Sequence, residues 1–289
     1  VNNAAMSIAA NAEDVQIAGG VEHMDHIPMN KDYNPSPRMF HHHCEGVMQM
    51  GLTAEYLTMK YSISRQQQDE FAFRSHKLAA EATDKGLFKN EVIPVWGRNE
   101  QGIKTLVTED QCIRRDTSVE GLAKLPAAFN PAGGSVTAGN SSPMNVGAAA
   151  LLVMSEDKAK ELGLKPIARI RAMASAGVNP EEMGIGPVPA VQKALKRAGL
   201  KLEDINIMEL NEAFAVQVLS VGRLLGIDLD KNKVNLRGGA VAIGHPLGAS
   251  GARICTTLLH RMRDEGAKFG LASMCVGGGQ GTCTIFEAV

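Results

Sequence analysis

The strongest constraint on the fold is an alternation of strand and helix signals that runs from residue 147 to the end of the chain. Short apolar segments, typical of buried strands, alternate with segments whose apolar residues recur at helical spacing. The predicted strands cover 147–154, 167–174, 205–210, 271–276 and 282–287, and the predicted helices cover 155–162, 188–198, 213–225 and 250–262. This order predicts an α/β protein built from layers of helices and sheets. A glycine-rich turn at 277–281 predicts that the last two strands form a hairpin.

The earlier part of the chain is less regular. Residues 1–13 have helical spacing, and 15–18 form a short apolar strand that ends at a pair of glycines. Residues 21–142 are rich in Met, His and polar residues and are interrupted by proline, so we interpret them as an insertion in the more regular scaffold. Within the insertion, Ser64 and Gln67 predict a capping box at the start of a helix.

Composition narrows the class of protein. Of 289 residues, 44% are hydrophobic, and 30 basic side chains nearly balance 31 acidic ones. There is no basic stripe with interleaved aromatic residues, which argues against a nucleic-acid partner. The longest apolar run is too short for a membrane span, and the start of the sequence has no signal-peptide pattern. The five cysteines are scattered without a CxxC pair, which predicts free thiols in a reducing, cytoplasmic compartment.

Polar residues at the ends of two predicted strands are the first candidates for chemistry. Asn211 and Glu212 follow the strand 205–210, at the edge where α/β folds place their ligands. A plain helix cap is an equally weighted alternative. Cys275 lies beside Gly277 near the end of another strand, where a thiol close to free backbone N–H groups can act as acid, base or nucleophile. The commoner role of such a cysteine is that of a small buried hydrophobic residue.

Two loops provide further candidates. His245 lies in a turn bracketed by Gly244 and Gly248, and a histidine there can exchange a proton with a thiol or donate a hydrogen bond to an oxyanion. Taken alone, a loop histidine is more often exposed or held structurally. Residues 137–142 form a loop of small residues that suits a narrow cleft for an extended ligand, or an ordinary turn.

The run His41–Cys44 raises the question of a metal site. Adjacent histidines in an extended segment point to opposite faces, and no matching ligand pair lies at zinc-site spacing. We therefore expect a solvated or structural histidine run and no metal site.

Taken together, these motifs resemble the thiolase family along the whole chain. The ordered set is Gly19–Met24 (GGVEHM), Thr137–Asn140 (TAGN), Asn211–Ala215 (NEAFA), Gly244–Pro246 (GHP) and Cys275–Gly277 (CVG). Each motif alone is moderately specific, whereas five in this order are strong. The GGVEHM form and the Met274-Cys275 ending look most like the thiolase subunits of bacterial fatty-acid oxidation complexes.

The resemblance implies a thiolase fold, which is layered α-β-α-β-α and has two similar halves with a loop domain inserted in the first. By this likeness, residues 1–20 and 143–160 belong to an incomplete N-terminal half, residues 21–142 are the loop domain, and residues 161–289 are the C-terminal half. It also implies four catalytic roles. Asn211 would hold a water in one oxyanion hole, and His245 would complete that hole and help to activate the nucleophile. Cys275 would be the acid/base, and the Gly277 N–H would serve the other oxyanion hole.

The implied activity is thiolytic cleavage of 3-ketoacyl-CoA by CoA in β-oxidation, which yields acetyl-CoA and a shortened acyl-CoA. Ser142 would contact the pantetheine of CoA, with Ala138 nearby. CoA would be a co-substrate, with no metal or organic cofactor. The likeness further implies a homodimer or larger assembly and a hydratase/dehydrogenase partner subunit. The Met-rich residues 21–60 suit adaptable contacts, although packing inside the loop domain is an equally weighted alternative.

Three alternatives share the fold: an acetoacetyl-CoA thiolase, a decarboxylating ketoacyl synthase, and a non-catalytic acyl-CoA-binding protein of thiolase shape. The NEAFA and CVG motifs together argue against the synthase. In the family, the nucleophilic cysteine lies well before the motif at Glu22–Met24, and none of the five cysteines here occupies that position. We therefore expect the chain as given to be truncated at its N-terminus and inactive, whereas its parent protein would be an acyltransferase.

Overall fold

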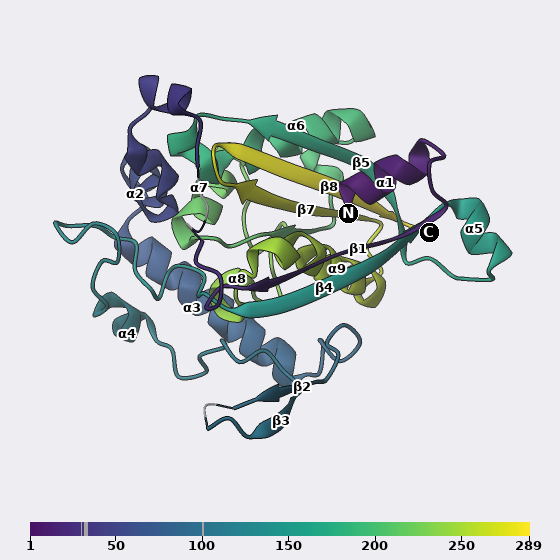
Figure 1. Cartoon of the computed structure of the whole chain (residues 1–289), viewed down its shortest axis with the longest axis horizontal. Helices are drawn as coiled ribbons and strands as arrows, with labels where there is room; N and C mark the ends of the chain where they lie inside the picture. Colours follow the sequence, from purple (N-terminus) through teal and green to yellow (C-terminus); the bar gives the residue numbers. More distant parts are fainter. Residues whose placement is uncertain (30, 32–33, 100) are drawn as a thin grey trace.

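The structure is a computed structural model that describes residues 1–29, 31, 34–99 and 101–289. Its main sheet has four strands in the order β5-β8-β7-β6 (Figure 1). They are β5 (Ala168–Gly177), β8 (Gln280–Ala288), β7 (Phe269–Val276) and β6 (Ile207–Leu210). β6 runs parallel to β7, whereas β7 is antiparallel to β8 and β8 to β5. The hairpin predicted at the end of the chain is therefore confirmed.

A second sheet consists of β1 (Val15–His23) and β4 (Val146–Met154), which pair antiparallel along their whole length. β1 is longer than the predicted strand 15–18, because pairing continues through the two glycines. The prediction that 147–154 is a buried strand is wrong for one face. Its side chains alternate in exposure, and Leu152 is 58% exposed while its neighbour Leu151 packs into the core.

A layer of helices separates the two sheets (Figure 1). α9 (Leu247–Glu265) contacts β6 and β7 on one side and β1 and β4 on the other. α1 (Asn2–Ala9) joins this layer, because it packs on β1 and β4 while Asn2 exchanges hydrogen bonds with Thr282 and Thr284 of β8, at 3.2 and 2.6 Å. α6 (Pro187–Ala198) and α7 (Ala215–Leu225) pack against the other face of the main sheet. The layered α/β class is thus confirmed.

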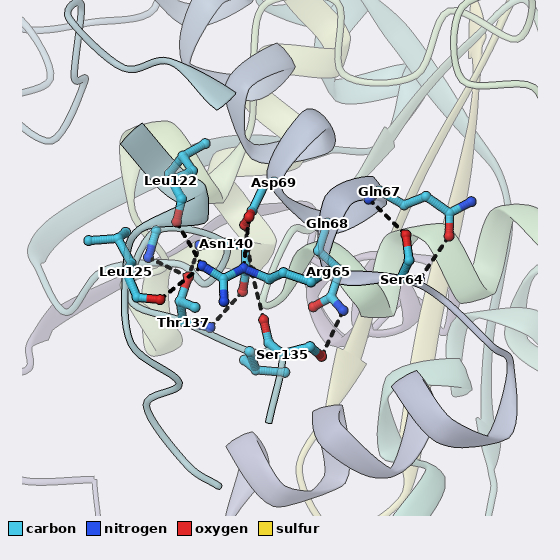
Figure 2. Close-up of polar contacts among 12 residues, drawn as sticks. Ser64, Arg65, Gln67, Gln68, Asp69, Leu122, Leu125, Ser135, Thr137 and Asn140 are labelled. Carbon is cyan, nitrogen blue, oxygen red and sulfur yellow. Dashed lines mark hydrogen bonds and ion pairs between the residues drawn. The ribbon is translucent and has the colours of Figure 1, made fainter. Parts of the chain in front are cut away.

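The segment between β1 and β4 carries its own short elements. They are η1 (Pro37–His41), η2 (Glu45–Met48), α2 (Met50–Lys60), α3 (Arg65–Asp84), β2 (Val95–Arg98), β3 (Lys104–Val107) and α4 (Val119–Ala123). The predicted capping box opens α3: Ser64 Oγ accepts from the Gln67 N–H at 3.2 Å, and Gln67 Oε1 accepts from the Ser64 N–H at 2.8 Å (Figure 2).

The remaining elements are α5 (Glu156–Glu161), η3 (Pro180–Ile185), η4 (Leu202–Asp204) and α8 (Ala240–Ile243). Ser155 caps α5 by accepting from the Lys158 N–H at 3.2 Å, as predicted. Gly163 follows α5 and Gly199 follows α6, and both have a positive φ, so these predicted helix stops are confirmed.

The core of the C-terminal half lies on both faces of the main sheet. α6 and α7 bury apolar residues against one face, and α9 buries Ile254, Leu258 and Met262 against the other. α9 also buries Arg261, whose guanidinium lies 2.7 Å from the carboxylate of Glu209 on β6. Among the described residues, no helix is both long and apolar enough to cross a membrane.

A close contact between two backbones holds the turn after β7 in place, and it allows a stability prediction. A Cβ atom at Gly281 would collide with the backbone of Gly186 and Pro187. Gly281→Ala should therefore destabilise the protein by about 1–3 kcal/mol, because the backbone must shift to relieve the overlap. Gly251→Ala is the control: it lies inside α9, its Cβ would make only an ordinary contact, 3.7 Å from Met274 Sδ, and it should not destabilise. Thermal unfolding of both variants gives the comparison, and equal midpoints would contradict the prediction.

Candidate active site

The carboxyl ends of β6 and β7 place two candidate residues at one edge of the main sheet. The strands are parallel with Leu210 opposite Ser273, and the Asn211 N–H donates to the Ser273 carbonyl at 2.9 Å. Asn211 is fully buried, and its Nδ2 lies 3.3 Å from Nε2 of His245. Its Oδ1 accepts no hydrogen bond from any described residue. Since a buried acceptor without a partner is costly, this oxygen is suited to a bound water or ligand.

His245 reaches Asn211 from the turn between α8 and α9. Gly244, which precedes it, has a φ of +96°, a conformation that favours glycine. The Nδ1 of His245 lies 2.6 Å from Ser250 Oγ, and the Ser250 hydroxyl donates to the Pro246 carbonyl at 3.0 Å. Because that hydroxyl has only one proton to donate, it accepts from Nδ1–H of His245. Nε2 then carries the lone pair and faces the amide N–H of Asn211.

Burial keeps His245 neutral. It is 9% exposed, and burial, assisted by the positive charge of Arg253, lowers its pKa to about 4. A neutral imidazole with its lone pair on Nε2 can accept a proton at that nitrogen and, once protonated, can donate a hydrogen bond from it. The geometry therefore fits a histidine that first accepts a proton at Nε2 and then donates a hydrogen bond from the same nitrogen.

Cys275 lies near the carboxyl end of β7, the strand adjacent to Asn211. The thiol is 5% exposed and packs in an apolar cluster that includes Leu57, Met183 and Phe214. Burial raises the pKa of Cys275 to about 12, so the group is a protonated thiol at neutral pH. Gly277 follows in the turn that leads to β8. Cys275 is thus both a member of the core and a proton donor at the edge of the site.

The small-residue loop at 137–142 lies directly against the segment that follows Asn211. Ser142 donates to the Ala213 carbonyl twice, from its N–H at 3.0 Å and from its hydroxyl at 3.1 Å. The Ala215 N–H donates to the Asn140 carbonyl at 2.9 Å. The structure thus brings Ser142 next to the catalytic candidates. Ala138 is exposed at the other end of the loop.

Buried charges that sequence analysis did not single out hold this loop (Figure 2). The Asn140 amide donates to Asp69 of α3 at 3.0 Å, and Asp69 pairs with Arg65 at 2.7 Å. Figure 2 shows Arg65 reaching across to the carbonyls of Leu122 and Leu125. Asp69 is 1% exposed, although it lies on a helix that is polar overall. The only sign of this role in the sequence was that the Asp69 carboxylate lies on the apolar side of the predicted helix.

The structure also shows the surroundings of Glu212 and of the His41–Cys44 run. One of two equally weighted interpretations of Asn211 and Glu212 was that both point at a ligand, the other being a plain helix cap. Glu212 does not, because its carboxylate is enclosed by Ser75, Asn235 and the Val241 N–H. In the His41–Cys44 run, His43 Nδ1 lies 3.1 Å from a carboxylate oxygen of Glu181. Within the described ranges, no group of three or more His, Cys, Asp or Glu residues could hold a metal ion.

Two protein-family domains match this chain, and both are thiolase domains. Residues 1–157 match the N-terminal domain of thiolases, and residues 164–288 match the C-terminal domain. The chain belongs to the thiolase family. It is 54% identical to the 3-ketoacyl-CoA thiolase of Saccharophagus degradans and 52% identical to that of Pseudoalteromonas translucida. The alignments include 100% of this chain and 74% and 75% of those proteins.

Solved thiolase structures have the same fold. Human mitochondrial 3-ketoacyl-CoA thiolase superimposes with a TM-score of 0.90 at 38% identity, and the Bacillus anthracis acetyl-CoA acetyltransferase with 0.88 at 40%. In both cases the match includes 100% of this chain and 75% of the other. The family resemblance and the thiolase fold expected from the motifs are confirmed.

The tautomer assigned to His245 can be tested in this thiolase directly. Ser250→Ala removes the acceptor for Nδ1–H, so the form protonated on Nε2 should become populated. NMR of protein labelled with 15N-histidine measures the ratio of the two forms. Ser220→Ala is the matched control, because Ser220 is equally buried and its hydroxyl also donates to a carbonyl four residues earlier, at 2.7 Å. An unchanged ratio in Ser250→Ala would contradict the assignment.

Proposed function

We propose that this protein is a 3-ketoacyl-CoA thiolase of β-oxidation, which uses CoA to cleave 3-ketoacyl-CoA into acetyl-CoA and a shortened acyl-CoA. The observation that carries the proposal is the buried contact between Asn211 Nδ2 and His245 Nε2, at 3.3 Å, next to β7, which carries Cys275 near its carboxyl end. Family membership and the names of the relatives support the same reaction. The mechanism below follows from the chemistry of these groups.

In the first half-reaction, the thiolate of the family's nucleophilic cysteine, whose position none of the five cysteines in this sequence occupies, attacks the keto carbon of the substrate. His245 accepts the thiol proton at Nε2, where the lone pair lies, and then donates a hydrogen bond from that nitrogen to the enolate oxygen that develops on the leaving acetyl-CoA. Asn211 orients a water towards the same oxyanion. The Gly277 N–H serves the second oxyanion hole. A single oxyanion donor of this kind is worth on the order of 3 kcal/mol.

The bond between the α and β carbons then breaks, and its electron pair forms the enolate of acetyl-CoA. Cys275 donates its proton to that carbanion and becomes a thiolate, while the acyl group stays on the attacking sulfur as a thioester. In the second half-reaction, the Cys275 thiolate takes the proton of CoA-SH, and the CoA thiolate attacks the acyl group. Acyl-CoA leaves, the released nucleophilic thiolate takes back its proton from His245, and Cys275 is again a thiol, as its raised pKa requires at neutral pH.

CoA binding is assigned to the loop that precedes β4. Ser142 lies against the backbone of Ala213 and would contact the pantetheine arm, with Ala138 further along the same loop. We propose that CoA acts as co-substrate, that no metal or organic cofactor takes part, and that the protein works in the cytoplasm.

The test of the function is an assay of CoA-dependent cleavage of 3-ketoacyl-CoA substrates of different lengths, with protein expressed from its complete coding sequence. Turnover of medium and long chains supports the proposal. Activity on acetoacetyl-CoA alone would favour the acetoacetyl-CoA thiolase alternative, which the similarity to the Bacillus anthracis acetyl-CoA acetyltransferase motivates. Acyl-CoA binding without any turnover would identify a non-catalytic binding protein.

Removing either oxyanion-hole residue should affect catalysis more than binding. His245→Ala and Asn211→Ala should each lower kcat by about 10²–10³-fold with a much smaller change in KM. The double variant should lose less than the product of the two, because both side chains act on one oxyanion. Steady-state kinetics of the three variants measures this, and full additivity would show that the two residues serve separate steps.

Cys275→Ala should separate acylation from turnover. The variant should still accept an acyl group slowly but should hardly turn over, because Cys275 transfers protons and forms no covalent bond to the acyl group. Mass spectrometry of the enzyme mixed with 3-ketoacyl-CoA locates the acyl group. Finding it on Cys275 in the unmodified enzyme would reverse the assignment.

The proposed assembly is a homodimer or larger, with a hydratase/dehydrogenase subunit as partner. The methionines that suggested adaptable contacts divide in the structure: Met24 is buried and Met50 packs in the core, whereas Met29 and Met59 are 61% and 73% exposed. Met29 and Met59 therefore have the exposed surface that a contact with a partner needs. Light scattering at micromolar concentration should show at least a dimer, and purification from the native cells should recover the second subunit. A monomer would contradict the predicted dimer. Recovery of the thiolase alone would contradict the predicted partner subunit.

A further inference from the structure

Glu212, the residue after Asn211, has its carboxylate in a fully enclosed site of hydrogen-bond donors. Its Oε1 accepts from the Asn235 amide at 2.8 Å. Its Oε2 accepts from the Ser75 hydroxyl at 2.6 Å and from the Val241 N–H at 3.1 Å. The side chain has no exposed surface, so it touches neither substrate nor solvent. Burial raises the pKa of Glu212, and the three donors act against that rise.

Two of these partners lead directly to the two oxyanion-hole residues. Asn235 exchanges a pair of hydrogen bonds with Leu210, the residue before Asn211: the Leu210 N–H donates at 2.8 Å and the Leu210 carbonyl accepts at 2.7 Å. Val241 lies in α8, which ends at Ile243, two residues before His245. Glu212 therefore links the backbone on the Asn211 side to the backbone on the His245 side.

The third partner connects this link to the inserted segment. The Ser75 hydroxyl, on α3, donates to Glu212 and accepts from the Gly239 N–H at 3.1 Å. A Cβ atom at Gly239 would collide with the Glu212 carboxyl group, so the backbone entering α8 lies directly against the carboxylate. α3 and the start of α8 are thus held to the same carboxylate oxygen, Oε2.

We propose that Glu212 is a positioning residue that sets the distance between Asn211 and His245. It holds the two backbone segments that carry these side chains, and it does so without contacting the reacting atoms. This inference rests on the proposed function only in assuming that Asn211 and His245 form one oxyanion hole.

The site distinguishes a carboxylate from an amide, which makes the proposal testable. In Glu212→Gln, one acceptor oxygen becomes an N–H₂ group. The glutamine side chain can adopt two orientations. If its N–H₂ group replaces Oε1, it faces the Asn235 amide donor; if it replaces Oε2, it faces the Val241 N–H. Asn235 cannot turn its own amide round without losing both hydrogen bonds to Leu210. In either orientation, two buried N–H donors therefore face each other without an acceptor between them. An unsatisfied buried donor of this kind costs about 1–3 kcal/mol of folding free energy.

The experiment compares Glu212→Gln with Glu209→Gln in the protein expressed from its complete coding sequence. Glu209 lies on β6, is 1% exposed, and pairs with Arg261 at 2.7 Å; within the described ranges its side chain makes no hydrogen bond to Asn211 or His245. Thermal midpoints, kcat and KM for thiolysis, and the 15N signals of His245 are measured for both. Glu212→Gln should lower kcat by about 10–100-fold with little change in KM, because an opposed donor pair displaces the catalytic groups. It should also shift the Nε2 signal of His245.

Glu209→Gln should lower the thermal midpoint but leave kcat and the His245 signals unchanged. If Glu212→Gln fails to fold, Ser75→Ala replaces it: this variant removes one donor and should lower kcat by a smaller factor, again at constant KM. The proposal is overturned if the Glu212 or Ser75 variant loses thermal stability while kcat and the His245 signals stay as in the parent protein. The His245 signals test the positioning role even if the parent protein shows no thiolysis, so failure of the proposed function is seen separately.

Discussion

Burial of α9 between two sheets determines where His245, the proposed catalytic histidine, lies. The first turn of this helix touches β1 so closely that a Cβ at Gly20 would collide with the Gly248 carbonyl. Glu22, also on β1, accepts from the Gly248 N–H at 3.1 Å. The other side of the helix packs on β6 and β7, which carry Asn211 and Cys275 at their ends. Because α9 is held from both sides, the turn that bears His245 has little freedom relative to the main sheet.

The same burial sets the protonation states that the chemistry needs. Removal from water disfavours charge on any isolated group. It therefore lowers the pKa of His245 to about 4 and raises that of Cys275 to about 12. One base without its proton and one acid with its proton then coexist at a single sheet edge at neutral pH. An exposed histidine and an exposed thiol have ordinary pKa values of about 6.5 and 8.5, closer to neutrality, so a larger fraction of each would be in the other form.

Local signals in the sequence predicted local structure well. The Ser64 capping box and the Gly199 helix stop depend on neighbouring residues, and both are present. The motifs placed Asn211 and His245 at element junctions, and only the family resemblance put them in one oxyanion hole, because their contact joins residues far apart in the chain. The enclosure of Glu212 and the bond from Asn140 to Asp69 were missed for the same reason. The predicted burial of residues 147–154 also failed on one face, because an apolar run alone does not show what packs against it.

The pairing of β1 with β4 has a consequence for how the chain folds. Val15 lies opposite Met154 and His23 opposite Val146, so this ladder closes around the entire inserted segment. Bringing such distant strands together carries a loop-closure entropy that grows with the length of the intervening chain. Contacts of this kind are slow to form compared with helices and hairpins. The inserted segment should therefore become compact first, and the ladder that supports α9 should be completed late, so that the catalytic edge is among the last parts of the molecule to acquire its final geometry.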